Sequence, residues 1–405
     1  MLSKRAINFY NEALKIIPQA TQTGSKRPVK EYDGVMPLTI ESGKGCRFTD
    51  IDGKEYIDWG ASLGPIILGY AYDEVDDAVR KQLNKGTIFG MPSPIEYELA
   101  KEMINVIPGI DMVRFLKTGG DVCSAAVRLA RAYTGREKII SIGYHGWHDT
   151  FMAAIPQFEG IPKALRDLVI SIPFNDFDAV KEVFEKEKEN IAAVITIPFN
   201  FEDNPPDGKY FPEMRSLCDK YGSVLIFDEV LAGFRLALGG GIEYHKVQPD
   251  LVVYGKAIAN GYPLAAFAGK REIMSVIDKT LITTTLGGET LSLAASLATI
   301  KILQRDNVHA ELYRRGKILM DGMNNLIKKY SIPGKLKGIP VGFTLILNDD
   351  ISEEELNRVI KMEREIFELG VFMDKDRTWL VSYSHTDDDI KKTLEIIETA
   401  FKSVQ

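Results

Sequence analysis

The chain has 405 residues, of which 45% are hydrophobic and 26% charged, a composition that is ordinary for a globular protein and argues against disorder. Its formal net charge of -7 has the wrong sign for a nucleic-acid-binding protein, and no basic run stands out. The three cysteines are widely separated and form no Cys-x-x-Cys pair, which argues against a disulfide framework or a structural zinc site and favours a reducing compartment.

Residues 1–20 lack the continuous apolar core of a signal peptide. Their pattern instead predicts an amphipathic helix that stops near Pro18. No stretch of the chain approaches the ~20 apolar residues that a membrane span needs. We therefore expect a cytoplasmic protein.

Alternating apolar and polar residues over 43–60, around a turn at Asp52 and Gly53, predict a β-hairpin. Further along, short apolar runs alternate with stretches of helical period from about residue 90 to 270, which is typical of βα units and a largely parallel sheet. A helix that ends at Gly135 is expected between the first two of these strands. The expected strands cover residues 112–118, 138–144, 191–199, 223–230 and 251–256.

The last hundred residues predict a smaller α+β domain. A strand over 341–348 precedes a helix that opens with a capping box of Ser352 and Glu355 and closes at Gly370. A short strand over 379–383 then leads to a final helix. The fold class that we expect is α/β, a large domain with a mostly parallel sheet plus a smaller α+β domain. The expected divisions are an N-terminal segment over 1–60 that packs with the small domain, the large domain over 61–300 and the small domain over 301–405.

Ligands of parallel α/β sheets bind beyond the carboxyl ends of the strands, so the residues that follow each strand are the candidates for a site. The first strand ends in Thr118, Gly119 and Gly120 and runs into a helix, which suits a phosphate, although an ordinary strand–helix turn has the same sequence. The second strand ends in Tyr144 and His145. Tyr144 either offers an aromatic face beside the same crevice or packs in the core.

Two charged residues end the later strands. Asp228 closes a run of apolar residues, where a carboxylate costs free energy unless it meets a cation or a donor, and Lys256 ends the next strand. Pyridoxal phosphate (PLP) needs an anion cradle, an aromatic platform, a carboxylate for its pyridine nitrogen and a lysine for its Schiff base. A structural ion pair of Asp228 and Lys256, or a metal site at His145, His148 and Asp149, is the alternative.

Five stretches carry a resemblance to a known family: "DMVRFLKTGGDVCSAAVRLARAYTGREKII", "YHGWHD", "LIFDEVLAGFR", "PDLVVYGKAIANGYP" and "TLGGETLSLAASLATI". They resemble the motifs of class III PLP-dependent aminotransferases, and within that class the chain is similar to the glutamate-1-semialdehyde 2,1-aminomutases. The resemblance implies the type I PLP-dependent aminotransferase fold, bound PLP, a small-molecule amine donor and carbonyl acceptor, and a homodimer with shared active sites. It implies neither a nucleic-acid nor a membrane partner.

The resemblance also implies roles for single residues. Lys256 matches the family's Schiff-base lysine and Asp228 its pyridine-nitrogen partner, and these two are the expected catalytic residues. Val230 matches a residue that packs on one face of the ring, and Tyr144 stacks on the other, with His145 beside it.

Five further residues match cofactor-binding positions of the family. Thr118, Gly119 and Gly120 fall on the phosphate loop, and Thr285 matches a threonine that reaches the phosphate from the neighbouring subunit. Asn200 sits where many relatives place an amide near the phenolic oxygen of the ring.

The chain departs from the aminomutase pattern on the substrate side. Arg27 lies near the family's carboxylate-binding arginine but out of register, Leu63 replaces a pocket tryptophan, and Ile197 replaces an acid. The usual Ser-Gly-Asn-Pro becomes Gly-Gly-Glu-Thr over 287–290. Because buried polar groups discriminate strongly between substrates, their loss predicts a different substrate.

Three residues are the expected substrate contacts: Ser62, Trp147 and Glu289. A carboxylate at Glu289 would favour an amine or a hydroxylated substrate, but the residue reads equally well as an N-terminal acid of the following helix.

The expected activity is amino-group transfer to an aldehyde or ketone acceptor, an oxidised sugar or a small carbonyl intermediate, through the Lys256 Schiff base. The aminomutase reaction is the first alternative, and a lyase or racemase on the same scaffold is another. A metal-dependent hydrolase built on His145, His148 and Asp228 and a non-catalytic binding protein are the alternatives from other classes.

Overall fold

A computed structural model describes residues 2–155 and 157–404 and divides the chain into two compact units. The first unit holds the chain up to Tyr72, the short stretch Phe201–Asp203 and the chain from Ala310 on. The second unit holds Asp73–Asn200 and Asn204–His309. Among the described residues, none of the helices combines the length and the apolar character needed to cross a membrane.

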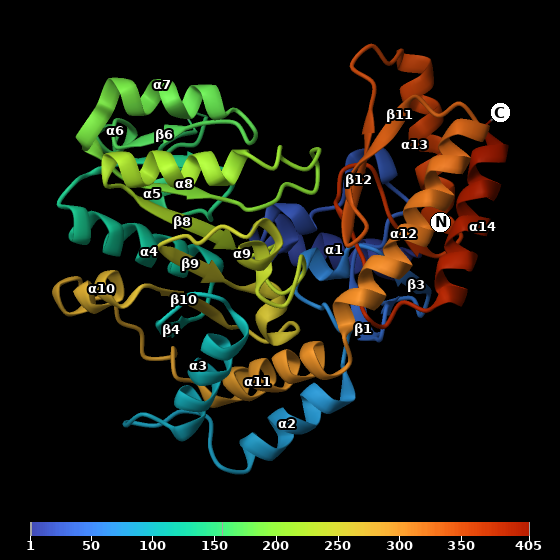
Figure 1. Cartoon of the computed structure of the whole chain (residues 1–405). Helices are drawn as coiled ribbons and strands as arrows, with labels where there is room; N and C mark the ends of the chain where they lie inside the picture. The colour runs from blue at the N-terminus through green and yellow to red at the C-terminus, as the bar shows by residue number, and fades with distance from the viewer. Residues whose placement is uncertain (1, 156, 405) are drawn as a thin grey trace. The chain divides into compact units, whose positions relative to one another are not determined.

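The second unit is built on a seven-stranded sheet (Figure 1). Strand β10 runs antiparallel to both of its neighbours, and the remaining pairs are parallel, which confirms the mostly parallel sheet. In spatial order the strands are β4 (Met112–Leu116), β10 (Ala265–Gly269), β9 (Leu251–Tyr254), β8 (Val224–Glu229), β7 (Ile191–Thr196), β5 (Lys138–Ile142) and β6 (Val169–Ser171).

Helix α4 (Gly119–Thr134) packs across β10, β9, β8 and β7, because its small and aliphatic residues share one buried face. It ends as predicted at Gly135, whose φ of 69° is the left-handed conformation that glycine adopts easily. Helix α11 (Thr290–Arg305) lies against α2 and α3 (Figure 1). The other helices of this unit are α2 (Asp73–Leu83), α3 (Pro94–Val106), α5 (Asp149–Met152), α6 (Lys163–Arg166), α7 (Phe177–Glu187), α8 (Tyr210–Tyr221), α9 (Gly240–His245) and α10 (Arg271–Met274), with the 3-10 turns η5 (Lys188–Asn190), η6 (Lys256–Ala259) and η7 (Ser275–Lys279).

The first unit contains two small sheets. The predicted hairpin forms β2 and β3, which β1 and the parallel strand β13 extend to four strands, and β11, β12 and β14 form the other sheet. The strands are β1 (Ile40–Lys44), β2 (Arg47–Asp50), β3 (Glu55–Asp58), β11 (Gly334–Ile339), β12 (Gly342–Leu347), β13 (Val371–Phe372) and β14 (Trp379–Leu380).

The helices of the first unit follow the predicted caps. Helix α13 (Glu353–Glu368) opens with the Ser352–Glu355 capping box, and α1 (Lys4–Ile16) ends just before Pro18. Strand β14 is shorter than predicted, because the backbone N–H of Ser382 donates to Nδ1 of His385 at 3.0 Å and the chain turns there. The remaining elements are α12 (Val308–Lys329), α14 (Asp387–Ser403), η1 (Pro18–Ala20), η2 (Gly24–Lys26), η3 (Lys30–Tyr32) and η4 (Ala61–Leu63).

Candidate active site

Lys256 follows strand β9 and opens the short turn η6. Its φ of 44° lies in the left-handed region, which non-glycine residues seldom enter and which persists where the surroundings hold it, often at functional sites. Burial lowers the pKa of the Lys256 ammonium; the carboxylate of Asp228 opposes this change and the guanidinium of Arg235 adds to it. The amine is therefore more available as a nucleophile than that of a surface lysine.

Asp228 is 3% exposed near the end of β8 and is held by residues distant in sequence. Its Oδ2 lies 2.6 Å from Nδ1 of His145 and 3.4 Å from Sγ of Cys123, and its Oδ1 accepts the backbone N–H of Val230 at 3.0 Å. An ionised carboxylate can only accept hydrogen bonds, so in that state Nδ1 of His145 would be the donor. A carboxylate oxygen has two lone pairs, and among the described residues Oδ1 accepts only the bond from Val230, so it has room for a further donor.

These contacts bear on the two alternatives drawn from the sequence. The hydrogen bonds of Asp228 go to His145, Cys123 and its own loop, which is not the pattern of a purely structural ion pair with Lys256. Among the described residues, ligand atoms of Cys123, His145 and Asp228 lie within 4.8 Å of one another, but His148 is not in that group. The hydrolase arrangement of His145, His148 and Asp228 is therefore not assembled.

The predicted phosphate loop is the N-terminus of α4. Thr118 caps the helix: its hydroxyl accepts the N–H of Asp121 at 3.2 Å, while Oδ2 of Asp121 accepts the N–H of Thr118 at 2.9 Å. The amides of Gly119 and Gly120 lie in the first helical turn, which has no internal acceptors for them and so favours an anion.

Val230 closes this loop against the lysine turn. A Cβ added to Gly119 would lie 2.9 Å from Cγ1 of Val230, and one added to Gly255 would lie 3.2 Å from the same atom. The ends of strands β4, β8 and β9 thus meet at one side chain. The predicted convergence of residues beyond the strand ends is what the structure shows for these positions.

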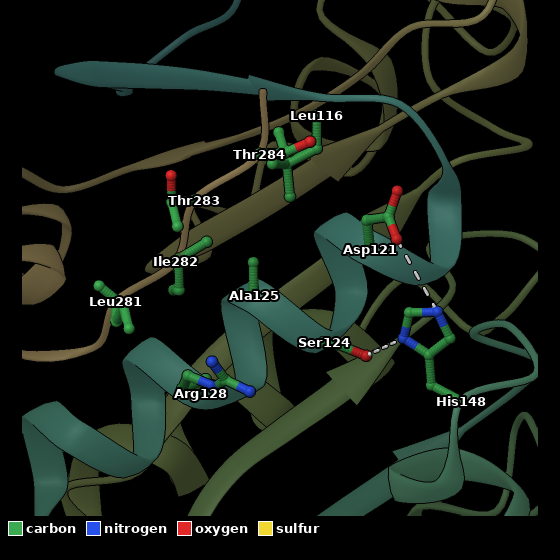
Figure 2. A pocket seen from close by; sticks show the side chains of 10 residues that line it. All are labelled: Leu116, Asp121, Ser124, Ala125, Arg128, His148, Leu281, Ile282, Thr283 and Thr284. Carbon is green, nitrogen blue, oxygen red and sulfur yellow. Dashed lines mark hydrogen bonds and ion pairs between the residues drawn. The ribbon is translucent and has the colours of Figure 1, made fainter. Parts of the chain in front are cut away.

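A cavity of about 350 Å³ lies beside the loop, between α4 and the segment 281–284 (Figure 2). On one side His148 turns toward α4: Nδ1 is 2.8 Å from the hydroxyl of Ser124 and Nε2 is 3.8 Å from the carboxylate of Asp121. A Cβ on Gly120 would lie 3.3 Å from Nε2 of His148. His148 therefore packs against the phosphate loop and lines this cavity.

Four further predicted residues lie in loops of the second unit. Tyr144 and Trp147 are exposed in the loop after β5, and the ring of Trp147 meets that of His148 edge-on at 4.9 Å. Asn200 is half-buried in the segment after β7, and Thr285 is exposed in the turn before α11. Their roles toward a cofactor remain predictions.

The other predicted substrate residues have different surroundings. Ser62 belongs to the first unit, in η4, where its backbone N–H donates to Asp58 and where Ala61, Ser62 and Leu63 all have positive φ. Glu289 accepts hydrogen bonds from the N–H groups of Leu291 and Ser292 at the start of α11. This agrees with the alternative that the residue is an N-terminal acid of that helix.

Sequence reasoning missed two residues that touch this site. Cys123 contacts Asp228, but its position on the apolar face of α4 predicts only a residue of the hydrophobic core. Lys117 donates to Glu289 at 3.0 Å, and it reads as the polar end of a strand. The signal for Cys123 was that it is the only thiol on a helix face of aliphatic and small residues.

The comparison with protein families agrees with this geometry. The model of the family described as Aminotransferase class-III matches residues 29–401. The chain belongs to this family. It is therefore a PLP-dependent class III aminotransferase or aminomutase, with the fold of that class.

Individual relatives match over the whole length. The chain is 36% identical to glutamate-1-semialdehyde 2,1-aminomutase of Persephonella marina, covering 100% of both proteins. It is 34% identical to 3-aminobutyryl-CoA aminotransferase of Cloacimonas acidaminovorans, covering 99% of this chain and 97% of that one. The structure of the FumI protein of Sphingopyxis sp. MTA144 in its PLP internal aldimine form superposes with a TM-score of 0.93 at 27% identity, covering 99% and 97%.

The residues present fit PLP. Nε2 of His145 is buried and has no hydrogen-bond partner among the described residues, and Nδ1 of the same ring holds Asp228. A Cβ at Gly119 or Gly255 would press against Val230, so the predicted phosphate loop and the lysine turn both pack on the side chain that is expected to meet the ring. When bound, PLP supplies a ring that withdraws electrons from the substrate carbon.

Proposed function

We propose that the protein is an aminotransferase that moves an amino group from an amine donor to an aldehyde or ketone other than glutamate semialdehyde, such as an oxidised sugar or a small carbonyl intermediate. The observation that carries the reaction type is the largely buried Lys256, with its lowered pKa, beside the fully buried Asp228. Lys256 would hold the cofactor covalently, and its amine would serve as the base and acid that carries the substrate proton. Asp228 keeps the ring nitrogen protonated.

The choice of acceptor rests on the departures from the aminomutase pattern. The two curated relatives named above carry different activities at 36% and 34% identity, so identity alone does not select between them. Arg27 is the nearest match to the carboxylate-binding arginine. Its Nε donates a hydrogen bond to the carbonyl oxygen of Gly24 at 3.5 Å. Leu63 supplies no indole where the aminomutases carry a tryptophan. Both features support a substrate other than glutamate semialdehyde.

Glu289 is bound to neighbouring residues of the chain. Its carboxylate already accepts from Lys117, Leu291 and Ser292, so it is engaged by the chain itself. It is therefore not available to select an amine or a hydroxylated acceptor.

A spectral screen tests the proposal. The PLP-loaded protein is mixed with single amine donors, and conversion of the cofactor absorbance to that of pyridoxamine phosphate identifies the donor. Aldehydes and ketones are then added to find which restores the original spectrum. Formation of 5-aminolevulinate from glutamate semialdehyde, without a separate donor, would instead assign the aminomutase reaction.

The same proposal includes a homodimer with shared active sites. Exposed apolar side chains gather on two segments of the second unit, with Met91 78% and Leu281 84% exposed. The segments are connected, because the backbone N–H of Thr290 donates to the carbonyl of Thr87 at 2.8 Å. A second copy of the chain would cover this apolar surface and receive Thr285, which is exposed four residues after Leu281.

A further inference from the structure

A shielded ion pair joins the phosphate loop to the segment that carries Thr285. Lys117 stands between β4 and Thr118, and its Nζ lies 3.0 Å from Oε2 of Glu289. Only 17% of the Lys117 side chain and 18% of the Glu289 side chain are exposed. The attraction between the two charges is therefore less screened than in the surface pairs that contribute little to stability.

Glu289 also accepts hydrogen bonds from its own helix. Its Oε1 accepts the N–H of Leu291 at 2.7 Å, and its Oε2 accepts the N–H of Ser292 at 3.2 Å and the hydroxyl of Ser292 at 2.7 Å. Burial raises the pKa of Glu289, but the hydrogen bonds from Ser292 and Lys117 outweigh it and hold the pKa below its usual value. The carboxylate is therefore held by its own helix as well as by Lys117.

A second contact brings the same two segments together. A Cβ on Gly287 would lie 2.6 Å from the carbonyl oxygen of Phe115, so the backbone of this turn lies directly against the end of β4. Phe115 and Lys117 on one segment thus meet Gly287 and Glu289 on the other. Thr285 precedes both contact points by a few residues.

We propose that Lys117 and Glu289 are a positioning pair for the phosphate of the cofactor. The pair fixes the loop of Thr118, Gly119 and Gly120, which serves this chain's own cofactor, against the turn that presents Thr285 to the cofactor of the second copy. It also neutralises a cation at the N-terminus of α4, where the helix dipole disfavours positive charge. The inference rests on the proposed function, since it concerns PLP at this loop.

The test measures PLP binding to the cofactor-free protein by fluorescence titration, and the environment of the bound phosphate by phosphorus NMR. Lys117→Met and Glu289→Gln are each expected to raise the dissociation constant of PLP about tenfold and to shift the phosphate resonance. Lys117→Arg keeps the charge and is expected to bind PLP within about threefold of the wild type. Glu289→Asp keeps the helix cap but shortens the reach, so it is expected to behave like Glu289→Gln.

A matched control comes from the same unit. Lys138 and Glu187 form an ion pair at 2.8 Å with 31% and 14% exposure, on β5 and α7. Lys138→Met is expected to leave the dissociation constant and the phosphate resonance unchanged. The melting temperature of each cofactor-free variant is measured alongside, so that loss of folding is recognised.

Three results would overturn the inference. If Lys117→Met weakens PLP binding and Glu289→Gln does not, Lys117 acts as a lone cation. If both variants lower only the melting temperature, with PLP affinity and the phosphate resonance unchanged, the pair is structural. A wild-type chain that does not bind PLP would overturn the proposed function as well, and this is seen before any variant is made.

Discussion

Asp228 receives its side-chain hydrogen bonds from residues far away in the chain. His145 precedes it by 83 positions and Cys123 by 105. A buried carboxylate needs such partners, because taking its charge out of water costs free energy that hydrogen bonds and nearby charges must offset. The His145 bond is the shortest of these, which makes it the strongest test of how Asp228 is held.

His145→Ala is expected to lower the free energy of unfolding of the cofactor-free protein by about 2–3 kcal/mol, because it removes a hydrogen bond to a buried charge. Urea denaturation measures the change. His148→Ala serves as the control, since that ring is partly exposed and a loss of about 1 kcal/mol or less is expected. Equal losses in the two variants would show that the Asp228 contact has no special weight.

How far the sequence predicts single residues depends on the kind of signal they leave. Asp228 and Lys256 are visible because a charge ends an apolar run. Cys123 is invisible because a thiol on a buried helix face packs like any small apolar side chain. The Lys117–Glu289 contact spans 172 positions, and no local pattern indicates which distant acid a lysine meets.

At the scale of elements, the turns after β4, β8 and β9 fit together through glycine. Gly119 and Gly255 both face Val230 so closely that neither can carry a side chain without a shift. The three turns therefore behave as one packed unit.

Gly119→Ala is expected to weaken PLP binding about tenfold, because its methyl group would lie 2.9 Å from Cγ1 of Val230 and displace the loop. In the background of Val230→Ala, which makes room for the methyl group, Gly119→Ala should weaken PLP binding less than it does in the wild type. Gly208→Ala, where the new methyl group meets nothing within 4 Å, should bind PLP as the wild type does. Unchanged binding by Gly119→Ala would show that the loop does not depend on this contact.

Two strands of the main sheet escaped prediction for physical reasons. Strand β10 is Ala-Ala-Phe-Ala-Gly, a buried run of residues with little β-branched character. Strand β6 is three residues long and lies at the edge of the sheet, so it offers no period to detect. The strands that were predicted are rich in Val and Ile and are bounded by glycine, proline or charged residues.

Helix α13 carries a buried acid, Glu363, which is 1% exposed and accepts the hydroxyl of Tyr32 at 2.6 Å. Burial raises its pKa to about 8, with Asp374 adding to the effect and Tyr32 opposing it. The native state thus binds this proton more tightly than the unfolded state does. The resulting stabilisation is complete below the ordinary pKa of 4.5 and is lost as the pH rises through about 8.

The wild type should therefore lose free energy of unfolding between pH 6 and pH 9, and Glu363→Gln should lose about 2–3 kcal/mol less over the same interval. Urea denaturation at the two pH values measures the difference. Glu229, whose pKa burial also raises to about 8, titrates in the same direction in both proteins and cancels in the comparison. Equal pH dependence in the two proteins would contradict the assignment.

At the scale of the whole molecule, the proposed dimer determines whether the apolar surface around Met91 and Leu281 is covered. Met91→Asp combined with Leu281→Asp is expected to give a monomer with weakened PLP binding, because two charges would be buried in the interface. Light scattering after size-exclusion chromatography measures the mass. Ile318→Asp, on α12, should leave the oligomeric state unchanged. A wild-type monomer would contradict the dimer.

The family and the chemistry follow from the sequence because the cofactor residues sit at strand ends and keep their spacing. The identity of the substrate does not follow from the sequence, because tertiary contacts position Ser62 and Glu289 and no sequence pattern predicts those contacts. Glu289 illustrates the limit: its helix-capping bonds and its bond to Lys117 become visible only in the folded chain.

The most direct test of the central claim is to find the lysine that binds PLP. The PLP-loaded protein is reduced with borohydride, digested and analysed by mass spectrometry. The phosphopyridoxyl group is expected on the peptide that contains Lys256, and Lys256→Arg should lose both this modification and the turnover. Stable modification of a different lysine, or full turnover by Lys256→Arg, would contradict the account.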